Sequence, residues 1–191
     1  MNIKLIKGLA LGGLLAASPL YAAEYAIDTE GVHASVNFRA NHLGFSWITG
    51  RLESFDGTFN YDAADPNSAS VKITIDAASV NTNQAERDKH LRSEEFLDVA
   101  TYPEITFVST SYITNGDGTG VLKGNLSLHG VTKPVTIKVT QVGEGDDPWG
   151  GYRAGFQGST ELRLKDFGIE YNLGPAAEII YLDLNIEGVR Q

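Results

Sequence analysis

Apolar and polar side chains alternate at every second position along most of this chain. Because successive side chains of a β-strand point to opposite faces, each alternating run predicts a strand with one apolar and one polar face. A weak run begins at Tyr25 and Ile27. The clear runs cover residues 32–40, 55–61, 71–75, 105–109, 122–128, 135–139, 152–162 and 180–186. The pattern therefore predicts about eight strands, each buried on a single face.

Strands of this kind form an antiparallel sheet with one dry side. Closing such a sheet into a barrel removes its exposed edges, and about eight strands leave room inside for side chains or one small ligand. We therefore predict an all-β fold with one helical crossover, built as an antiparallel β-barrel of about eight strands. A sandwich of two sheets satisfies the same periodicity and remains the alternative.

Four small residues, Gly57, Gly124, Ala154 and Gly158, fall on the apolar faces among large side chains. In a barrel they would leave a lengthwise channel, whereas at bulges or bends they would only allow the backbone to curve. The sequence supports both interpretations equally.

The segment 83–111 interrupts the strand pattern, because its first half is rich in charge and free of glycine and proline. Asn83 with Glu86 three residues later resembles a capping box, and Ser93 followed by two glutamates offers a second helix start. Pro103 ends the helical pattern. We expect a charged helical crossover that covers an end or a flank of the sheet. The simpler alternative is a solvated helix that only connects two strands.

Residues 1–22 have the features of a cleaved secretory signal peptide. Lys4 and Lys7 provide the positive start, residues 8–17 form an apolar core, and the predicted cut precedes Ala23. This core is shorter than the roughly 20 apolar residues that a membrane-spanning helix needs. We expect an exported chain whose mature domain, residues 23–191, has no integral membrane segment.

The mature part is acidic and lacks cysteine. Its formal net charge is −11, because the signal segment holds two of the lysines that bring the full chain to −9. This excess of acid repels phosphates, so nucleic acid is not an expected partner, and a polybasic attachment to membranes is also excluded. Without cysteine the chain forms no disulfide and carries no cysteine-linked lipid anchor. Its length suits one domain that is stabilised by burial and backbone hydrogen bonds.

Several stretches, in order over nearly the whole mature chain, carry a family resemblance. They read VNFRANHLGFSW, DGTFNYD, ERDKHLRSEEFLD with YPEITFVSTS, LKGNLSLHGVTKPVTI, GDDPWGGYRAGF, LKDFGI and LGPAAEI. In these the chain resembles the YceI-like family of periplasmic proteins. The resemblance implies a lipocalin-like barrel whose interior tunnel holds a polyisoprenoid chain.

The same resemblance implies a periplasmic, non-catalytic binding protein that uses no cofactor. Its partner would be a long isoprenoid lipid, such as a polyprenyl compound or a quinone, which it would transport, store or sequester. The oligomeric state is left open, a homodimer included.

Large apolar side chains from the alternating runs, from the NHLGFSW turn and from the helical segment are the candidates for lining such a tunnel. Each of them is also explained as ordinary core. The candidates are Phe38, Leu43, Phe45, Trp47, Ile73, Ile75, Leu91, Phe107, Leu126, Ile137, Phe156 and Leu184.

Polar side chains near a tunnel mouth are the candidates for contact with a lipid head group. They are Arg39, His42, Arg87, Asp88 and His90. For Arg87 and Asp88 the alternative is ion pairing along the helix, and for the two histidines it is a structural hydrogen bond.

Enzymatic signatures are weak in this sequence. It has no HExxH, GxSxG or P-loop pattern, and its four histidines lack the spacing of a zinc site. Asp146 and Asp147 resemble the paired carboxylates of glycoside hydrolysis, although they lie in a glycine-rich loop. We therefore expect neither catalysis nor a bound metal. The alternative is a glycan-directed periplasmic hydrolase that uses these loop carboxylates.

Overall fold

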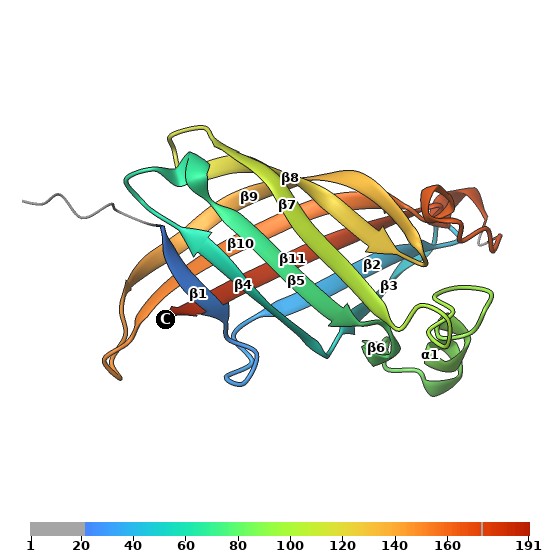
Figure 1. Cartoon of the computed structure of the whole chain (residues 1–191). Helices are drawn as coiled ribbons and strands as arrows, with labels where there is room; N and C mark the ends of the chain where they lie inside the picture. Colours follow the sequence, from blue (N-terminus) through green and yellow to red (C-terminus); the bar gives the residue numbers. More distant parts are fainter. Residues whose placement is uncertain (1–21, 173) are drawn as a thin grey trace, which may run out of the picture.

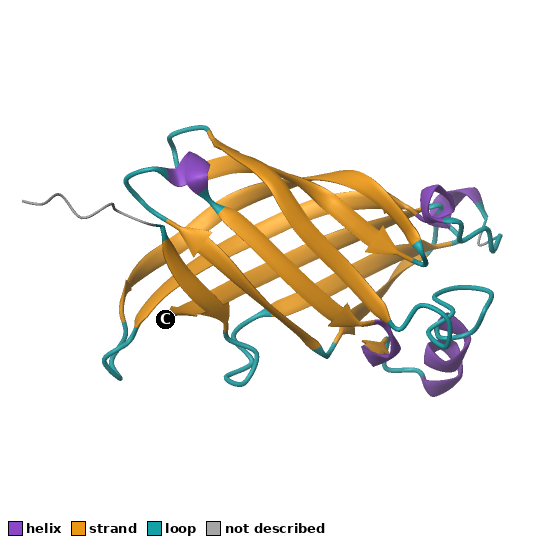
Figure 2. Cartoon of the chain, in the orientation of Figure 1, coloured by secondary structure: helices purple, strands orange, loops and turns teal. Residues whose placement is uncertain are grey.

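The computed structural model describes residues 22–172 and 174–191, so the predicted signal peptide lies outside the described residues except for Ala22. Strands dominate the fold and helices are short (Figures 1 and 2). The strands are β1 (Ala23–Ile27), β2 (Ser35–His42), β3 (Ser46–Leu52), β4 (Phe55–Tyr61), β5 (Ser70–Asp76), β6 (Val80–Asn81), β7 (Glu104–Thr114), β8 (Thr119–Leu128), β9 (Val131–Asp146), β10 (Tyr152–Arg163) and β11 (Ile179–Arg190). The α-helix is α1 (Ala85–Leu91), and the 3-10 helices are η1 (Pro66–Ser68), η2 (Ala77–Ser79), η3 (Leu164–Phe167) and η4 (Pro175–Ala177).

All strands belong to one antiparallel sheet that closes on itself. The order β1-β4-β5-β7-β8-β9-β10-β11 forms a ring, because β1 pairs with β4 on one side and with β11 on the other. The fold is thus the predicted eight-stranded antiparallel barrel with one short α-helix. Closure of the sheet decides against a two-sheet sandwich and leaves no free edge along the ring.

At three of the eight positions around the barrel, two separate strands take the place of one continuous strand. β1 and β2 pair with successive parts of β11, and β4 and β3 pair with β1 and β2 in turn. β6 then pairs with the end of β3, as β5 pairs with β4. The sheet therefore contains three more strands than the closed ring. These extra strands, β2, β3 and β6, lengthen one side of the barrel.

The predicted start of a strand at residue 32 is wrong, because the chain forms a loop between β1 and β2 there. Val32 lies in the loop between β1 and β2, where it is 81% exposed and has a φ of 57°. This left-handed backbone is unfavourable for a β-branched residue and incompatible with an extended strand. The strand therefore begins only at Ser35, and Val32 belongs to the alternating pattern by coincidence.

Helix α1 lies beyond β6 at one end of the barrel (Figure 1). Its N-cap is Gln84, whose side chain accepts a hydrogen bond from the Arg87 backbone N–H, and not the predicted Asn83. Asn83 has a φ of 60° and its N–H donates to Asn81 Oδ1 over 2.8 Å, which makes it part of the preceding turn.

The predicted second helix at Ser93 is wrong. Residues 92–101 form turns instead, in which the Leu97 N–H donates to the Leu91 carbonyl over 3.0 Å and Asp98 takes a φ of 43°. Phe96, only 4% exposed, belongs to the main core. Burial of this ring against the barrel outweighs the local helical preference of the segment.

No helix in the described ranges is long and apolar enough to cross a membrane.

Candidate binding cavity

The interior of the barrel holds a cavity of about 150 Å³. A single water needs roughly 10–15 Å³ on this measure, so the space is continuous over about ten water volumes. Side chains from β2, β4, β5, β7, β8, β9, β10 and β11 line it, and they are almost all apolar. An apolar cavity of this kind favours hydrocarbon over water, because water there would lack hydrogen-bond partners.

Seven of the predicted tunnel residues line this cavity. They are Ile73, Ile75, Phe107, Leu126, Ile137, Phe156 and Leu184. Each lies on the inward row of its strand, as the alternation of apolar and polar residues predicts.

The other five predicted tunnel residues lie elsewhere. The ring of Phe38 covers Gly50, where a Cβ would come within 2.4 Å of its Cζ atom, and Leu91 packs on the core from α1. Leu43, Phe45 and Trp47 are exposed in and beside the turn between β2 and β3. Among the described residues, β6 pairs with β3 only at Arg51 and Leu52, so the turn end of this hairpin extends past the closed wall. Leu43, Phe45 and Trp47 do not line the cavity.

Several lining residues were not singled out from the sequence. They include Val36, Phe59, Tyr61, Val71, Tyr112, Leu122, Val135, Val139, Leu182 and Ile186. Their signal was present, because most of them continue the same inward rows as the predicted residues. What the sequence does not show is which part of each row faces open space and which part is packed.

The small residues on the apolar faces have two different roles. A Cβ on Gly124 would lie 2.3 Å from the Phe107 ring, and one on Gly57 would lie 2.4 Å from the Lys72 carbonyl oxygen. These glycines allow close approach of neighbours and leave no channel. Gly158 does line the cavity, where a Cβ would meet Ile137 at 3.1 Å.

Aromatic rings pack at the end of the barrel where β4 finishes. Tyr25 stacks on Phe59 at 4.8 Å between ring centroids, and Phe156 meets both Phe59 and Tyr61 edge to face. The Tyr61 hydroxyl donates to Gln141 Oε1 over 3.2 Å. Burial raises the pKa of the Tyr61 hydroxyl, and the nearby Glu144 carboxylate raises it further. Tyr61 is therefore neutral and can donate or accept hydrogen bonds.

The head-group candidates do not form one site, and within the described residues none of them lines the cavity. Asp88 is 6% exposed and accepts hydrogen bonds from the Thr82 N–H and hydroxyl, while Arg87 donates to the Thr82 hydroxyl and carbonyl. These two residues attach α1 to the end of β6. His90 Nε2 lies 2.6 Å from Glu95 Oε2 at the surface.

The remaining two candidates belong to the β2–β3 hairpin. The Arg39 guanidinium lies 5.0 Å from the Trp47 ring centroid and 5.2 Å from that of Tyr181. His42 is exposed next to the turn.

Asp88→Ala is expected to lower the free energy of unfolding by about 1–3 kcal/mol, because it leaves two buried donors of Thr82 without an acceptor. Affinity for a ligand in the cavity should be unchanged. Urea denaturation checks the first point, and Glu86→Ala on the exposed face of the same helix is the control, with a change below about 0.5 kcal/mol. A stable Asp88→Ala protein that has lost ligand affinity would instead support a role at the head group.

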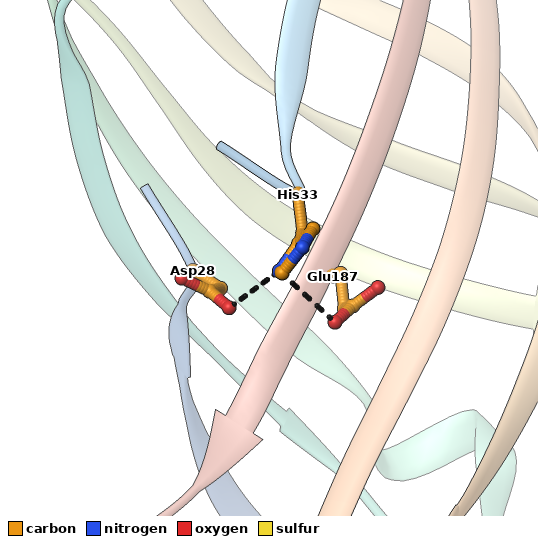
Figure 3. A group of neighbouring side chains, drawn as sticks. All are labelled: Asp28, His33 and Glu187. Carbon is orange, nitrogen blue, oxygen red and sulfur yellow. Dashed lines mark hydrogen bonds and ion pairs between the residues drawn. The ribbon is translucent and has the colours of Figure 1, made fainter. Parts of the chain in front are cut away.

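An ion-pair network joins the loop between β1 and β2 to strands β10 and β11. Asp28 and His33, from the loop between β1 and β2, and Glu187, from β11, point toward one another (Figure 3). Their ligand atoms lie within 4.8 Å of one another, a spacing that suits a metal ion. Arg153 Nη1, however, lies 2.6 Å from both Asp28 Oδ2 and Glu187 Oε1, so a guanidinium already neutralises these carboxylates. We therefore interpret the cluster as structural.

Asp147 belongs to the same network through its ion pair with Arg153. β9 continues to Asp146, so the connection to β10 is a turn of five residues, 147–151. Asp147 accepts from the Trp149 and Gly151 N–H groups, and its second oxygen accepts from Arg153 Nε over 2.8 Å. Hydrogen bonds from Gly151 and Arg153 lower the pKa of Asp147. Its oxygens are thus occupied in holding the turn.

The network predicts a loss of stability in acid. The Arg153 guanidinium, with His33 and the Gly31 N–H, holds the pKa of Asp28 far below its ordinary value, and the pKa of Asp147 is lowered as well. A carboxyl whose pKa is depressed in the folded state stabilises the fold above its unfolded pKa of about 3.9, and this contribution is lost as the pH falls below that value.

Arg153→Met is expected to lower the free energy of unfolding at pH 7. The difference in this free energy between the variant and the wild type should become smaller as the pH falls below about 4. Urea midpoints measured from pH 7 to pH 3 check this. The control is Arg163→Met, which breaks an exposed pair with Glu178 and should change little. A constant difference between Arg153→Met and the wild type across this pH range would contradict the assignment.

Comparison with known proteins agrees with this fold. Residues 25–188 match the YceI-like domain family. A UPF0312 protein of Pseudomonas aeruginosa is 55% identical, and one of Azotobacter vinelandii is 54% identical, each over 98% of both chains.

Solved structures of similar fold are more distant in sequence. The crystal structure of Burkholderia cenocepacia BcnA has a TM-score of 0.74 at 20% identity and covers 84% of this chain and 98% of its own. A polyisoprenoid-binding domain from Saccharophagus degradans has a TM-score of 0.64 at 18% identity and covers 89% of this chain and 99% of its own. From the family match over residues 25–188 and the relatives that are 54–55% identical over 98% of both chains, this chain belongs to the YceI-like domain family.

Proposed function

We propose that this protein binds one long apolar lipid of the isoprenoid class inside its barrel, and that it acts by transport, storage or sequestration rather than by catalysis. The observation that carries the proposal is the apolar cavity enclosed by the barrel wall. The structural likeness to a polyisoprenoid-binding domain supports the same ligand class. A polyprenyl compound or a quinone with an isoprenoid tail has this chemistry.

The energetics of such binding need few polar contacts. Burial of a methylene stabilises by about 0.8 kcal/mol, so an isoprene unit contributes about 3–4 kcal/mol. Association costs about 4–15 kcal/mol, and several buried units therefore suffice for tight binding. A lipid of this kind would also shield the cavity walls from water.

The proposed location is the periplasm. It rests on the signal-peptide features of residues 1–22 and on an acidic mature chain without cysteine. Detection of the mature protein in an osmotic-shock fraction, with an N-terminus at Ala23, tests this point. Retention of the full-length chain in the cytoplasm would contradict it.

The binding proposal is tested by titration of delipidated protein with geranylgeraniol as a soluble isoprenoid probe. We expect saturable uptake with one molecule per chain. A saturated fatty alcohol of the same carbon number serves as a second probe and measures selectivity for the branched tail. Absence of saturable binding for both compounds would overturn the proposal.

A further inference from the structure

Along the strands, the side chains that face the barrel interior change from apolar to polar at the end where β4 finishes. On β9 the row runs from Val135 through Ile137 and Val139, all lining the cavity, to Gln141. On β4 it runs from Phe59 to Tyr61. An apolar surface thus ends in groups that form hydrogen bonds.

Tyr61 and Gln141 are in direct contact. The Tyr61 hydroxyl donates to Gln141 Oε1 over 3.2 Å, which leaves the hydroxyl oxygen to accept and the Gln141 amide nitrogen to donate. Tyr112 also lines the cavity, and its hydroxyl rests against Gly120, where a Cβ would come within 2.4 Å of it. Tyr61 and Tyr112 are 6% and 7% exposed, so a ligand atom that reached them would be largely shielded from water.

Apolar side chains are buried inside the opposite end of the barrel. Phe96, Phe167 and Ile169, from the segment after α1 and from the η3 region, are buried there as part of the main core. Figure 1 shows these segments at the end that carries α1, away from the hairpin of β7 and β8. A bound lipid is therefore expected to direct its tail toward α1 and its polar head toward Tyr61 and Tyr112, where the head finds hydrogen-bond partners.

Charge around the polar end is mainly negative. The Glu144 carboxylate acts on Tyr61 and that of Asp117 acts on Tyr112, in each case raising the pKa of the phenol. Asp62 follows Tyr61 directly in the chain. The cations near this end include Arg190, whose guanidinium lies 5.1 Å from the ring centroid of Tyr152, and Arg153, which is already paired with three carboxylates. A phosphate placed against Tyr61 would face carboxylates in a partly desolvated site, which is unfavourable.

We propose, on the basis of the function proposed above, that the bound lipid has an uncharged polar head, a carbonyl or a hydroxyl, held by Tyr61, Gln141 and Tyr112, and that lipids with a phosphate head are rejected. Neutral hydrogen-bonding groups recognise such a head, and the neighbouring acids exclude an anionic one. The polar end of the cavity thereby sets the selectivity of the barrel.

Competitive titration of the delipidated mature protein tests this proposal. The probes share one tail and differ in the head: geranylgeraniol, geranylgeranyl phosphate and a benzoquinone with a geranylgeranyl tail. We expect the phosphate to bind at least about tenfold more weakly than the better of the two neutral probes. The comparison of the alcohol with the quinone tells which neutral head is preferred.

Variants assign the effect to the named groups. Tyr61→Phe should weaken the neutral probes about tenfold and leave a headless hydrocarbon of the same tail unchanged. Glu144→Gln should improve the relative affinity of the phosphate, whereas Glu161→Gln, an equal charge change on the outer face of β10, should not. Thermal melts of each variant confirm that it is folded.

Equal or tighter binding of the phosphate would overturn the selectivity while the lipid-binding function stands. A loss in Tyr61→Phe that is as large for the hydrocarbon as for the alcohol would remove Tyr61 from head recognition. Failure of every probe to bind would overturn the proposed function itself, and the selectivity with it.

Discussion

Leu184→Trp is expected to reduce isoprenoid binding by at least about tenfold, with little loss of folding. Leu184 lies on the inward row of β11 and lines the cavity, where its Cδ1 atom would be 3.3 Å from a Cβ on Gly158. An indole ring at this position occupies space that a lipid tail needs. The cavity offers room for the ring, so strain from overpacking should stay within about 1–3 kcal/mol.

The control for this change is the adjacent residue, Asn185, which is exposed on the outer face of the same strand. Asn185→Trp adds the same ring outside the barrel and should leave binding unaltered. Both variants are compared with the wild type by titration with geranylgeraniol. Equal affinities for all three proteins would show that the ligand does not lie beside Leu184.

Phe59→Ala is expected to lower the free energy of unfolding by about 3–5 kcal/mol. Phe59 is 5% exposed, stacks on Tyr25 at 4.8 Å and meets Phe156 edge to face at 5.6 Å. Its ring also covers Gly188, where a Cβ would lie 2.4 Å from it. Its removal therefore opens a hole at the seam where β1 joins β4 to β11.

Denaturation in urea measures this effect, and Phe45→Ala is the matched control. Phe45 is 86% exposed in the β2–β3 hairpin, so the same truncation there should change stability by less than about 0.5 kcal/mol. Similar losses in the two variants would mean that the seam does not depend on the aromatic cluster.

The alternating pattern was sufficient to predict the architecture and part of the cavity. A residue such as Ile137 or Leu126 is inward because its strand is buried on one face, and the sequence shows that face directly. The pairing of the first strand with the last, β1 with β11, was expected only because a closed barrel has no free edges.

Features that depend on tertiary contact were not predictable. Leu43, Phe45 and Trp47 are as apolar as core residues, and only the short β3–β6 pairing shows that their hairpin leaves the closed wall. Arg153 looked like one polar residue of an alternating strand, yet it neutralises Asp147 in the preceding turn and two carboxylates, Asp28 and Glu187, from other segments. Pairing across 125 positions of chain, as between Arg153 and Asp28, leaves no local signal.

The polar end of the cavity was missed for a related reason. Tyr61 and Tyr112 read as apolar members of their rows, and Gln141 lies just beyond the last clear alternation of its strand. Only the packed barrel brings the Tyr61 hydroxyl to the Gln141 amide.

Mass spectrometry of an organic extract from the protein, purified from its own cells without detergent, tests the lipid-binding claim most directly. We expect a single class of long-chain isoprenoid lipid in the extract, close to one molecule per chain, and far less of it with Leu184→Trp. An extract without any such lipid, from a protein that also takes up none when it is offered in excess, would contradict the account.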